Sequence, residues 1–346
     1  MRSRHKVLIV DDSSLMRQLL TQILSSDPEL EVIGTASDPF VAREKIKALH
    51  PDVLTLDIEM PRMDGLTFLE KLMRGHPMPV VMISSLTERG AETTLRALSL
   101  GAVDYIAKPK LDVSTGTIEQ ASDIIAKVKA AARVKVRGVS TQISPAALPA
   151  GYHFSATHKV VAIGASTGGT EALKDLLSPL PADFPGMVIV QHMPEAFTRP
   201  FAERLNSLCR IHVQEARDGD RILPGHALLA PGGHQMEVVR RGMEYAVRVY
   251  RGERVNRHLP SVDVLFSSCA RQLGKNALGV LLTGMGADGA KGLLEMKEAH
   301  AFTIAQDEAT CVVFGMPREA ILLGAADQVL ALGRIPAALL QRLGGT

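Results

Sequence analysis

The sequence predicts an α/β protein built from two doubly wound parallel sheets, one in each half of the chain. Three observations lead to this prediction. Short β-branched runs alternate with amphipathic segments of helical length in both halves. A stretch rich in Ser, Pro, Ala and Gly separates the two halves. The length of 346 residues also suits two domains better than one.

The first half shows the alternation clearly. Its apolar runs are KVLIV, EVIGTA, DVLTLD, PVVMIS and VDYIA. The segments between them are long enough for crossover helices, so we expect a first domain over residues 1–124. Ligands of an open parallel sheet bind beyond the carboxyl ends of its strands. The polar residues that follow the apolar runs are therefore the candidate functional residues.

Acidic residues gather at these predicted strand ends. Asp11 and Asp12 follow the first run, and Asp57 ends the third. Crowded carboxylates repel one another unless a cation lies among them, and Mg²⁺ prefers oxygen ligands. Ser84 ends the fourth run and Lys108 follows the fifth, and a hydroxyl and an ammonium group stabilise an added phosphoryl group. The alternative is that the acids only cap helices, which single Asp residues commonly do.

The motifs VDDS, LDIEMPRMDG, MISS and DYIAKP resemble the response-regulator receiver family over residues 5 to about 125. The resemblance implies that Asp57 accepts a phosphoryl group from a chemotaxis histidine kinase. It also implies a Mg²⁺ ion held by Asp11, Asp12, Asp57 and the backbone carbonyl of Glu59. The further positions that it implies are the switch hydroxyl Ser84, the switch aromatic Tyr105 and the phosphate-contacting Lys108.

Residues 125–150 read as a linker to a second domain over 151–346. They carry five basic and no acidic side chains, whereas residues 1–124 carry 14 basic and 18 acidic ones. This basic run is either a solvated helix end or a segment that docks on the acidic first domain.

Charge and hydropathy exclude several classes of protein. The second domain has 20 basic and 19 acidic residues and no helix-turn-helix pattern with a basic face, so nucleic acid is not an expected partner. The sequence has no run of 18 or more apolar residues, so we expect no integral membrane segment. Three cysteines, far apart and odd in number, predict reduced thiols in a cytoplasmic protein.

The second half repeats the strand and helix rhythm. Its apolar runs are KVVAIG, GMVIVQ, ALGVLLTG and AFTIAQ. The stretch HALLAPGGHQMEVV interrupts the rhythm and reads as a β-hairpin insertion with Pro-Gly-Gly at its turn.

The first of these runs ends in a Gly-x-Ser-x-Gly pattern, with Ser166 at its centre. No lysine follows the glycines as a nucleotide-binding P-loop requires, and the dinucleotide spacing is absent. The pattern indicates either a nucleophilic serine or a small-residue turn beside a helix. His192 and Asp288 follow two other predicted strands, and a serine nucleophile needs such a base and acid. The histidines that compete with His192 as base are His226, His234 and His258.

The motifs IGASTGGTEAL, VIVQHMPEAFT, HALLAPGGHQM and LLTGMGADGAKG resemble the catalytic domain of the chemotaxis protein-glutamate methylesterase family. The order receiver, linker, esterase also matches that family. The resemblance implies that Ser166 is the nucleophile, His192 the base and Asp288 the orienting acid. The other implied positions are the backbone amides of Thr167 and Met285 as the oxyanion hole, and Arg257 and His258 in a substrate groove.

The implied function is phosphorylation-activated hydrolysis of glutamate methyl esters on methylated chemoreceptors, with release of methanol and no cofactor for the esterase. The family also deamidates glutamine, and its receiver restrains its catalytic domain. Two alternatives belong to other classes. One is a non-catalytic output that binds a partner when Asp57 is phosphorylated, and the other is a phosphate-dependent DNA regulator.

Overall fold

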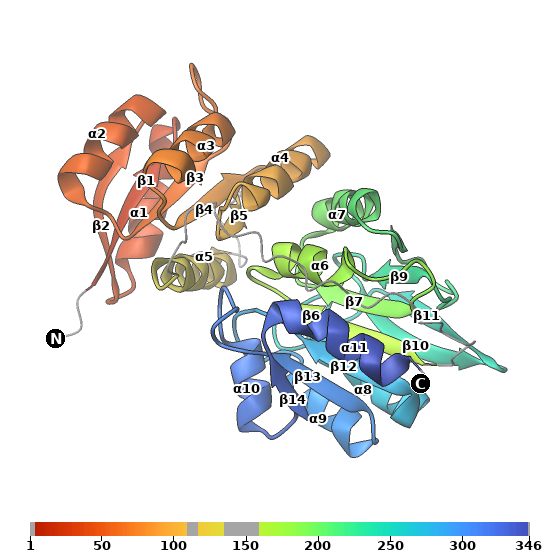
Figure 1. Ribbon diagram of the computed structural model, residues 1–346. Helices are drawn as coiled ribbons and strands as arrows, with labels where there is room; N and C mark the ends of the chain where they lie inside the picture. Colours follow the sequence, from red (N-terminus) through yellow and green to blue (C-terminus); the bar gives the residue numbers. More distant parts are fainter. Residues whose placement is uncertain (1–3, 109–116, 135–158, 345–346) are drawn as a thin grey trace. The chain divides into compact units, whose positions relative to one another are not determined.

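The computed structural model describes residues 4–108, 117–134 and 159–344 (Figure 1). The chain divides into two compact units, Met1–Gln142 and Ile143–Thr346. Within the described ranges, none of the helices combines the length and the apolar character that a bilayer-spanning segment needs.

The first unit contains a five-stranded parallel sheet with the strand order β2-β1-β3-β4-β5. All five apolar runs of the first half form strands, as predicted. The inner strands are buried on both faces because helices cover both sides, which explains why they read as continuous apolar runs. The strands are β1 (His5–Val10), β2 (Leu30–Ala36), β3 (Val53–Asp57), β4 (Val80–Ser84) and β5 (Asp104–Ala107).

Four helices connect these strands and a fifth follows β5, and the four connecting helices each begin at a side chain that accepts a hydrogen bond from the first turn. These caps are Ser13, Asp38, Asp64 and Thr87. The first and last helices pack together on one face of the sheet (Figure 1). The helices are α1 (Ser14–Ser25), α2 (Pro39–Leu49), α3 (Gly65–Gly75), α4 (Glu88–Ser99) and α5 (Thr117–Ala132).

Helix α5 extends through residues 125–132 of the segment that the sequence predicts as linker. Its core residues, which include Ile124 and Val128, lie among the side chains of the first unit. Residues 135–158, which hold the rest of the predicted linker, lie outside the described residues.

The basic residues of this segment pair with acidic residues of the first unit. Lys129 Nζ lies 2.7 Å from a Glu29 carboxylate oxygen and 3.1 Å from one of Asp27. Arg133 reaches Glu29 at 2.7 Å. Lys127 Nζ donates to the carbonyl oxygen of Tyr105 at 2.9 Å. The described part of the basic run, residues 127–133, therefore docks on the first unit, which was one of the two alternatives from sequence.

The second unit contains a seven-stranded parallel sheet with the order β14-β13-β12-β6-β7-β9-β8. The four apolar runs of the second half form four of these strands, as predicted. Two short strands, β8 and β14, were not predicted. The strands are β6 (Val160–Ala165), β7 (Met187–Gln191), β8 (His212–Glu215), β9 (His226–Leu229), β12 (Ala277–Leu281), β13 (Phe302–Gln306) and β14 (Gln328–Leu330).

Helix α8 (Val262–Leu273) is central to the core of this unit, since Val262, Leu265 and Phe266 are fully buried. It packs against β6, β7, β12 and the next helix, α9. The other helices are α6 (Gly169–Leu177), α7 (Glu195–Leu208), α9 (Ala290–Glu298), α10 (Met316–Leu322), α11 (Ile335–Leu343) and the short 3₁₀ turns η1 (Gly274–Asn276) and η2 (Leu332–Arg334).

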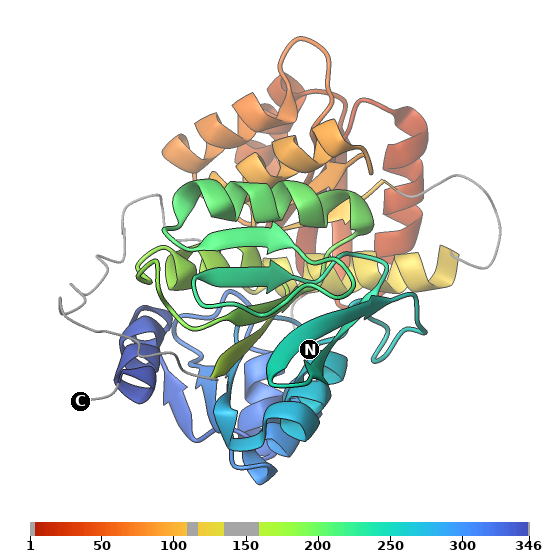
Figure 2. The same ribbon diagram turned by 90° about the vertical axis from the view of Figure 1, so that its right-hand side faces the viewer.

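A β-hairpin is present, but its predicted position was wrong. It is formed by β10 (Gln235–Arg241) and β11 (Glu244–Tyr250), the teal strands of Figure 2. The turn is Gly242-Met243, with Gly242 at a left-handed φ of 65°. The run 226–229 instead forms β9, which joins the parallel sheet between β7 and β8. Pro-Gly-Gly connects that buried strand to the hairpin.

Helix α3 begins so close to β3 that only glycine fits at its first position. A Cβ on Gly65 would lie 1.9 Å from the carbonyl oxygen of Asp57, whereas one on Gly75, at the other end of α3, would meet nothing within 4 Å. We expect Gly65→Ala to lower the free energy of unfolding of the first unit by about 1–3 kcal/mol, the usual range for overpacking. Gly75→Ala should raise it slightly, since alanine favours helix by roughly 1 kcal/mol. Equal effects of the two substitutions in denaturant titrations would contradict this packing.

Candidate functional site

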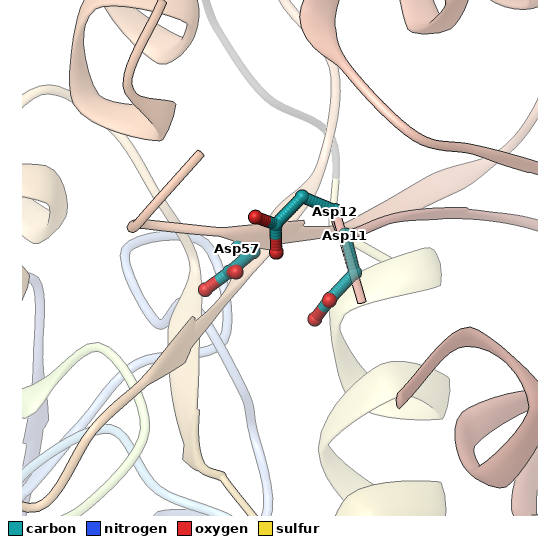
Figure 3. Close-up of side chains that lie close together, drawn as sticks. All are labelled: Asp11, Asp12 and Asp57. Carbon is teal, nitrogen blue, oxygen red and sulfur yellow. The ribbon is translucent and has the colours of Figure 1, made fainter. Parts of the chain in front are cut away.

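Three carboxylates lie together at the carboxyl end of the first sheet (Figure 3). One oxygen each of Asp11, Asp12 and Asp57 lies within 4.8 Å of the others. Asp11 and Asp57 are completely buried, and Asp12 is exposed. The strand order explains the cluster, because β1 and β3 are neighbours and both end at this edge.

This cluster is electrostatically unfavourable without a cation. Burial and the neighbouring Asp57 charge raise the pKa of Asp11 to about 6. Burial also raises the pKa of Asp57, although Lys108 Nζ lies 2.9 Å from both of its carboxylate oxygens. Asp11 Oδ2 is buried and has no hydrogen-bond partner. An oxygen-only donor set with an unsatisfied buried oxygen fits Mg²⁺. The Glu59 amide donates to Asp57 at 3.4 Å, which places Glu59 beside the same cluster.

The predicted switch residues lie on the next two strands. Ser84 Oγ is buried and accepts a 2.7 Å hydrogen bond from Thr94 Oγ1 in α4. Its own contacts to the carbonyl oxygens of Ser85 and Gly90 are longer, at 3.2 and 3.3 Å. Tyr105 is buried in this structure. Thr94 Oγ1 also donates to the Gly90 carbonyl oxygen at 2.6 Å, so its one hydroxyl proton is shared between Ser84 and Gly90.

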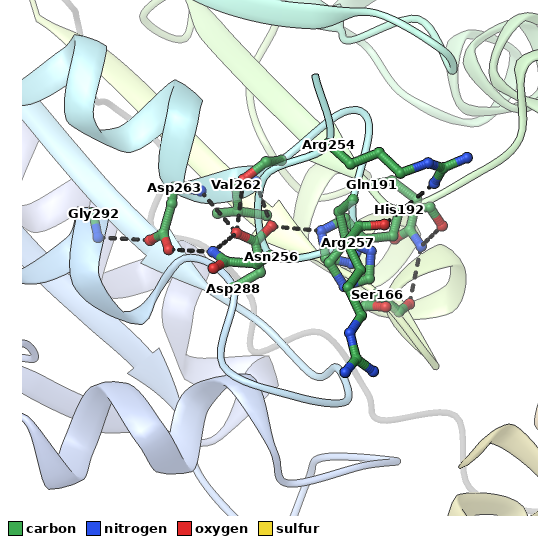
Figure 4. Close-up of polar contacts among 12 residues, drawn as sticks. Ser166, Gln191, His192, Arg254, Asn256, Arg257, Val262, Asp263, Asp288 and Gly292 are labelled. Carbon is green, nitrogen blue, oxygen red and sulfur yellow. Dashed lines mark hydrogen bonds and ion pairs between the residues drawn. The ribbon is translucent and has the colours of Figure 1, made fainter. Parts of the chain in front are cut away.

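The second candidate site lies at the carboxyl ends of three adjacent strands (Figure 4). Ser166 follows β6, His192 follows β7, and Asp288 follows β12. Because β6 lies between β12 and β7, the serine comes from the middle strand and its two partners from either side. His192 Nε2 lies 2.8 Å from Asp288 Oδ2, and both side chains are buried.

Among the described residues of this site, Asp288 is the carboxylate that accepts the most hydrogen bonds. Burial alone would raise its pKa, but the hydrogen bond and charge of His192, followed by the hydrogen bonds from Asn256 and Ser261, hold the pKa well below its usual range. Three of its donors are at the start of α8, where helix N–H groups favour an anion. The five donors are His192 Nε2 at 2.8 Å, Asn256 Nδ2 at 2.7 Å, Ser261 Oγ at 2.7 Å, Val262 N at 2.6 Å and Asp263 N at 3.3 Å.

The hydrogen bond to Asp288 assigns the tautomer of His192. An ionised carboxylate only accepts, so Nε2 carries the proton and Nδ1 holds the free electron pair. His192 Nδ1 is buried and has no hydrogen-bond partner. The ring of His258 stacks on that of His192 with centroids 3.6 Å apart and planes inclined by 5°. His192 thus has one nitrogen fixed and the other available as an acceptor.

The turn that carries Ser166 requires the small residues around it. A Cβ on Gly164 would lie 2.3 Å from Val262 Cγ1, and one on Gly168 would lie 2.5 Å from Val312. Gly168 also has a left-handed φ of 78°. The Gln191 amide group donates to the Ser166 carbonyl oxygen at 2.9 Å. These contacts fix the backbone at Ser166, as expected for a serine on a tight strand-to-helix turn.

The remaining predicted residues have different surroundings. Thr167 is buried next to Ser166, and its carbonyl oxygen accepts from Thr283. Met285 is half-buried between Gly284 and Gly286, in the loop after β12. Of the competing histidines, His226 and His234 contact backbone carbonyl oxygens at 3.0 and 3.2 Å, and only His258 lies against His192.

Sequence reasoning missed the residues that support this site. Asn256 and Ser261 hold Asp288, and Thr94 holds Ser84. The serine immediately before α8 was a readable helix-start signal, but nothing in the sequence connected it to Asp288. Asn256 carried no signal, because it reaches Asp288 from an irregular loop.

Comparison with known proteins agrees with this architecture. Residues 161–339 match the family model for CheB methylesterase, and residues 7–118 match that for the response regulator receiver domain. A relative from Pseudomonas aeruginosa, a protein-glutamate methylesterase/protein-glutamine glutaminase, is 60% identical and covers 97% of this chain and 96% of its own. One of the same name from Geobacter metallireducens is 59% identical over 96% and 94% of the two chains.

A solved structure supports the assignment of the second unit. The catalytic domain of Thermotoga maritima CheB methylesterase is 38% identical, with a TM-score of 0.52, and it covers 53% of this chain and 98% of its own. Both the fold class and the family resemblance predicted from sequence are thereby confirmed. With a family model matching more than half of its length, and relatives of about 60% identity matching almost all of it, the chain belongs to the CheB methylesterase family.

Proposed function

We propose that this protein is a phosphorylation-activated serine hydrolase that cleaves glutamate methyl esters on chemoreceptors and deamidates receptor glutamines. The observation that carries the proposal is the buried Asp288–His192 pair, at 2.8 Å, on strands that flank Ser166. The names of the relatives, protein-glutamate methylesterase/protein-glutamine glutaminase, support both reactions.

The reaction proceeds by acyl transfer. Ser166 Oγ attacks the side-chain carbonyl carbon of the glutamate ester while His192 Nδ1 takes its proton. The proton then passes to the leaving oxygen, and methanol departs. Water attacks the acyl-enzyme with His192 again as base, which releases the glutamate carboxylate and restores the serine. A glutamine amide reacts in the same way and releases ammonia.

The surroundings of His192 suit this role. When Nδ1 takes the serine proton, the imidazolium that forms lies next to a carboxylate that is already ionised and fixed by other donors. No proton needs to reach Asp288. The backbone amides of Thr167 and Met285 are the proposed donors to the oxyanion, because they belong to the turns that follow β6 and β12 on either side of Ser166.

The first unit supplies the control. Asp57 accepts the phosphoryl group from the kinase, and Lys108 stabilises the product from 2.9 Å. Asp11, Asp12, Asp57 and the Glu59 carbonyl would hold Mg²⁺, which would neutralise the crowded anions. Ser84 then donates to the phosphoryl group. We place these exchanges in the cytoplasm, where the three free cysteines stay reduced.

Replacing the nucleophile tests the enzyme against a non-catalytic output. We expect Ser166→Ala to fold normally and to lose at least about 10³-fold in ester hydrolysis, measured as methanol release from methylated receptor membranes. A fluorophosphonate probe should label the wild type and not this variant. Ser178→Ala, at the end of α6, is the control and should react like the wild type. Wild-type labelling that persists in Ser166→Ala would disprove the nucleophile.

Removing the acceptor tests the control by phosphorylation. With acetyl phosphate and Mg²⁺, methanol release by the wild type should rise about tenfold or more, in the usual range of coupling free energies. Asp57→Ala should be equally active with and without acetyl phosphate. Chelating the divalent ions should abolish the rise in the wild type. Activation of Asp57→Ala to the wild-type level would exclude Asp57 as the acceptor.

Because the pKa of Asp11 is raised, its charge should lower the free energy of unfolding of the first unit when no Mg²⁺ is bound. An Asp with a folded pKa of about 6 destabilises the fold once pH exceeds its unfolded value of 3.8, and the penalty grows until about pH 6. Without Mg²⁺ at pH 7, Asp11→Asn should therefore raise the free energy of unfolding of the first unit by up to about 3 kcal/mol. The gain should shrink as pH falls from 6 toward 3.8. The variant should also lose Mg²⁺-dependent phosphorylation. A gain that does not depend on pH would contradict this account.

A further inference from the structure

The loop beside the catalytic pair contains a two-residue turn in an unusual conformation. Val255 and His258 exchange backbone hydrogen bonds of 3.1 and 2.8 Å, and they enclose Asn256 and Arg257. These two residues have φ values of 52° and 71°. Positive φ at both central positions is the arrangement of a type I′ turn, in which asparagine is favoured first and glycine second.

Arg257 thus occupies the position where glycine is preferred. A positive φ is uncommon for a long side chain and persists only where the surroundings hold it. Here they do. Asn256 Nδ2 donates to Asp288 at 2.7 Å and to Asp263 at 2.6 Å, the His258 ring stacks on His192, and Arg254 Nη1 donates to the Arg257 carbonyl oxygen at 3.2 Å. The turn is therefore fixed to both the acid and the base.

The side chain of Arg257 has no evident structural role to offset this strain. It is exposed and, in the view of Figure 4, extends on the Ser166 side of Asp288. Across the described residues, no ion pair joins Arg257 or Arg254 to an acidic side chain. Arg251 is also exposed on the same loop. Among the described residues, the loop therefore exposes three arginines, Arg251, Arg254 and Arg257, against one acidic side chain, Glu253.

We propose that Arg257 forms a carboxylate subsite, which binds a free acidic side chain of the substrate segment next to the ester that Ser166 attacks. The inference rests on the proposed function. Guanidinium pairs well with carboxylate, and the turn points this one outward from a rigid base. The chemical class of the substrate is then an acidic peptide segment, and each hydrolysis adds a carboxylate to it.

Two variants separate the effect of the Arg257 charge from the effect of the backbone strain at this residue. Arg257→Gly removes the guanidinium and suits a positive φ, whereas Arg257→Lys keeps the charge. Arg240→Gln, on β10, is the matched control for the loss of one exposed arginine. All are assayed in the full chain, with Mg²⁺ and acetyl phosphate. The substrates are p-nitrophenyl acetate and two glutamate-methyl-ester peptides that differ only in neighbouring Glu or Met residues. Gln is avoided as the neutral neighbour because the proposed deamidase activity would alter it.

For Arg257→Gly we expect kcat/KM on the Glu-flanked peptide to fall about threefold to fivefold at low salt, the range of an exposed ion pair. The loss should shrink at 0.5 M salt, where the Debye length falls below about 5 Å. The Met-flanked peptide and p-nitrophenyl acetate should be hydrolysed as by the wild type. Arg257→Lys should recover most of the loss, and Arg240→Gln should show none. The Tm of the second unit should rise by about 2 °C in Arg257→Gly, because the strain is relieved.

Other outcomes overturn the inference. An equal loss on both peptides means that Arg257 acts without a substrate carboxylate. A lower Tm in Arg257→Gly means that the side chain has a structural role. If Arg257→Gly keeps the wild-type kcat/KM on the Glu-flanked peptide, the subsite is disproved while the proposed function stands. A wild type that hydrolyses neither peptide nor p-nitrophenyl acetate refutes the proposed function and the subsite with it.

Discussion

Both sites depend on one constraint of parallel sheets, which is that all strands end at the same edge. Polar side chains that follow neighbouring strands are forced together there, however far apart they lie in sequence. Asp11 and Asp57 meet because β1 and β3 are paired. Ser166 lies between His192 and Asp288 because β6 lies between β7 and β12. The same geometry brings together the proposed phosphoryl acceptor site in one unit and the proposed nucleophile with its base in the other.

The two units treat a buried carboxylate in opposite ways. Asp288 is surrounded by hydrogen-bond donors, which keep it ionised despite its burial. Asp11 receives one hydrogen bond, from the Ser13 amide, and its other oxygen has no partner, so burial raises its pKa. A permanently charged group suits the stabilisation of an imidazolium that forms in every cycle. A buried carboxylate such as Asp11, whose charge is unfavourable without a cation, suits a site that binds a cation for one reaction and then releases it.

The sequence was sufficient to predict the nine strands that begin as apolar runs, and the residues at their ends, because apolar runs bounded by polar residues are local features. It was not sufficient where contacts between distant parts of the chain determine the local structure. The hairpin was misplaced because Pro-Gly-Gly at 231–233 is a strong turn signal, whereas the true turn holds a single glycine, Gly242. Helix α5 was cut short because its lysines read as solvated, although Glu29, a hundred residues away, pairs with Lys129. The supporting contact from Asn256 depends on a loop whose backbone conformation no pattern indicated.

The difference in rigidity between the sites bears on how phosphorylation acts. His192 and Asp288 are already paired, buried and fixed by the start of α8, and the turn at Ser166 has no space to shift. The His192–Asp288 pair therefore needs no further assembly, whereas His192 Nδ1, the proposed acceptor of the Ser166 proton, has no hydrogen-bond partner. The adjustable contacts are in the receiver, where Ser84 Oγ lies 3.2 and 3.3 Å from the Ser85 and Gly90 carbonyl oxygens and shares the hydroxyl proton of Thr94 with Gly90. A switch of this kind changes a surface of the first unit, and not the chemistry of the second.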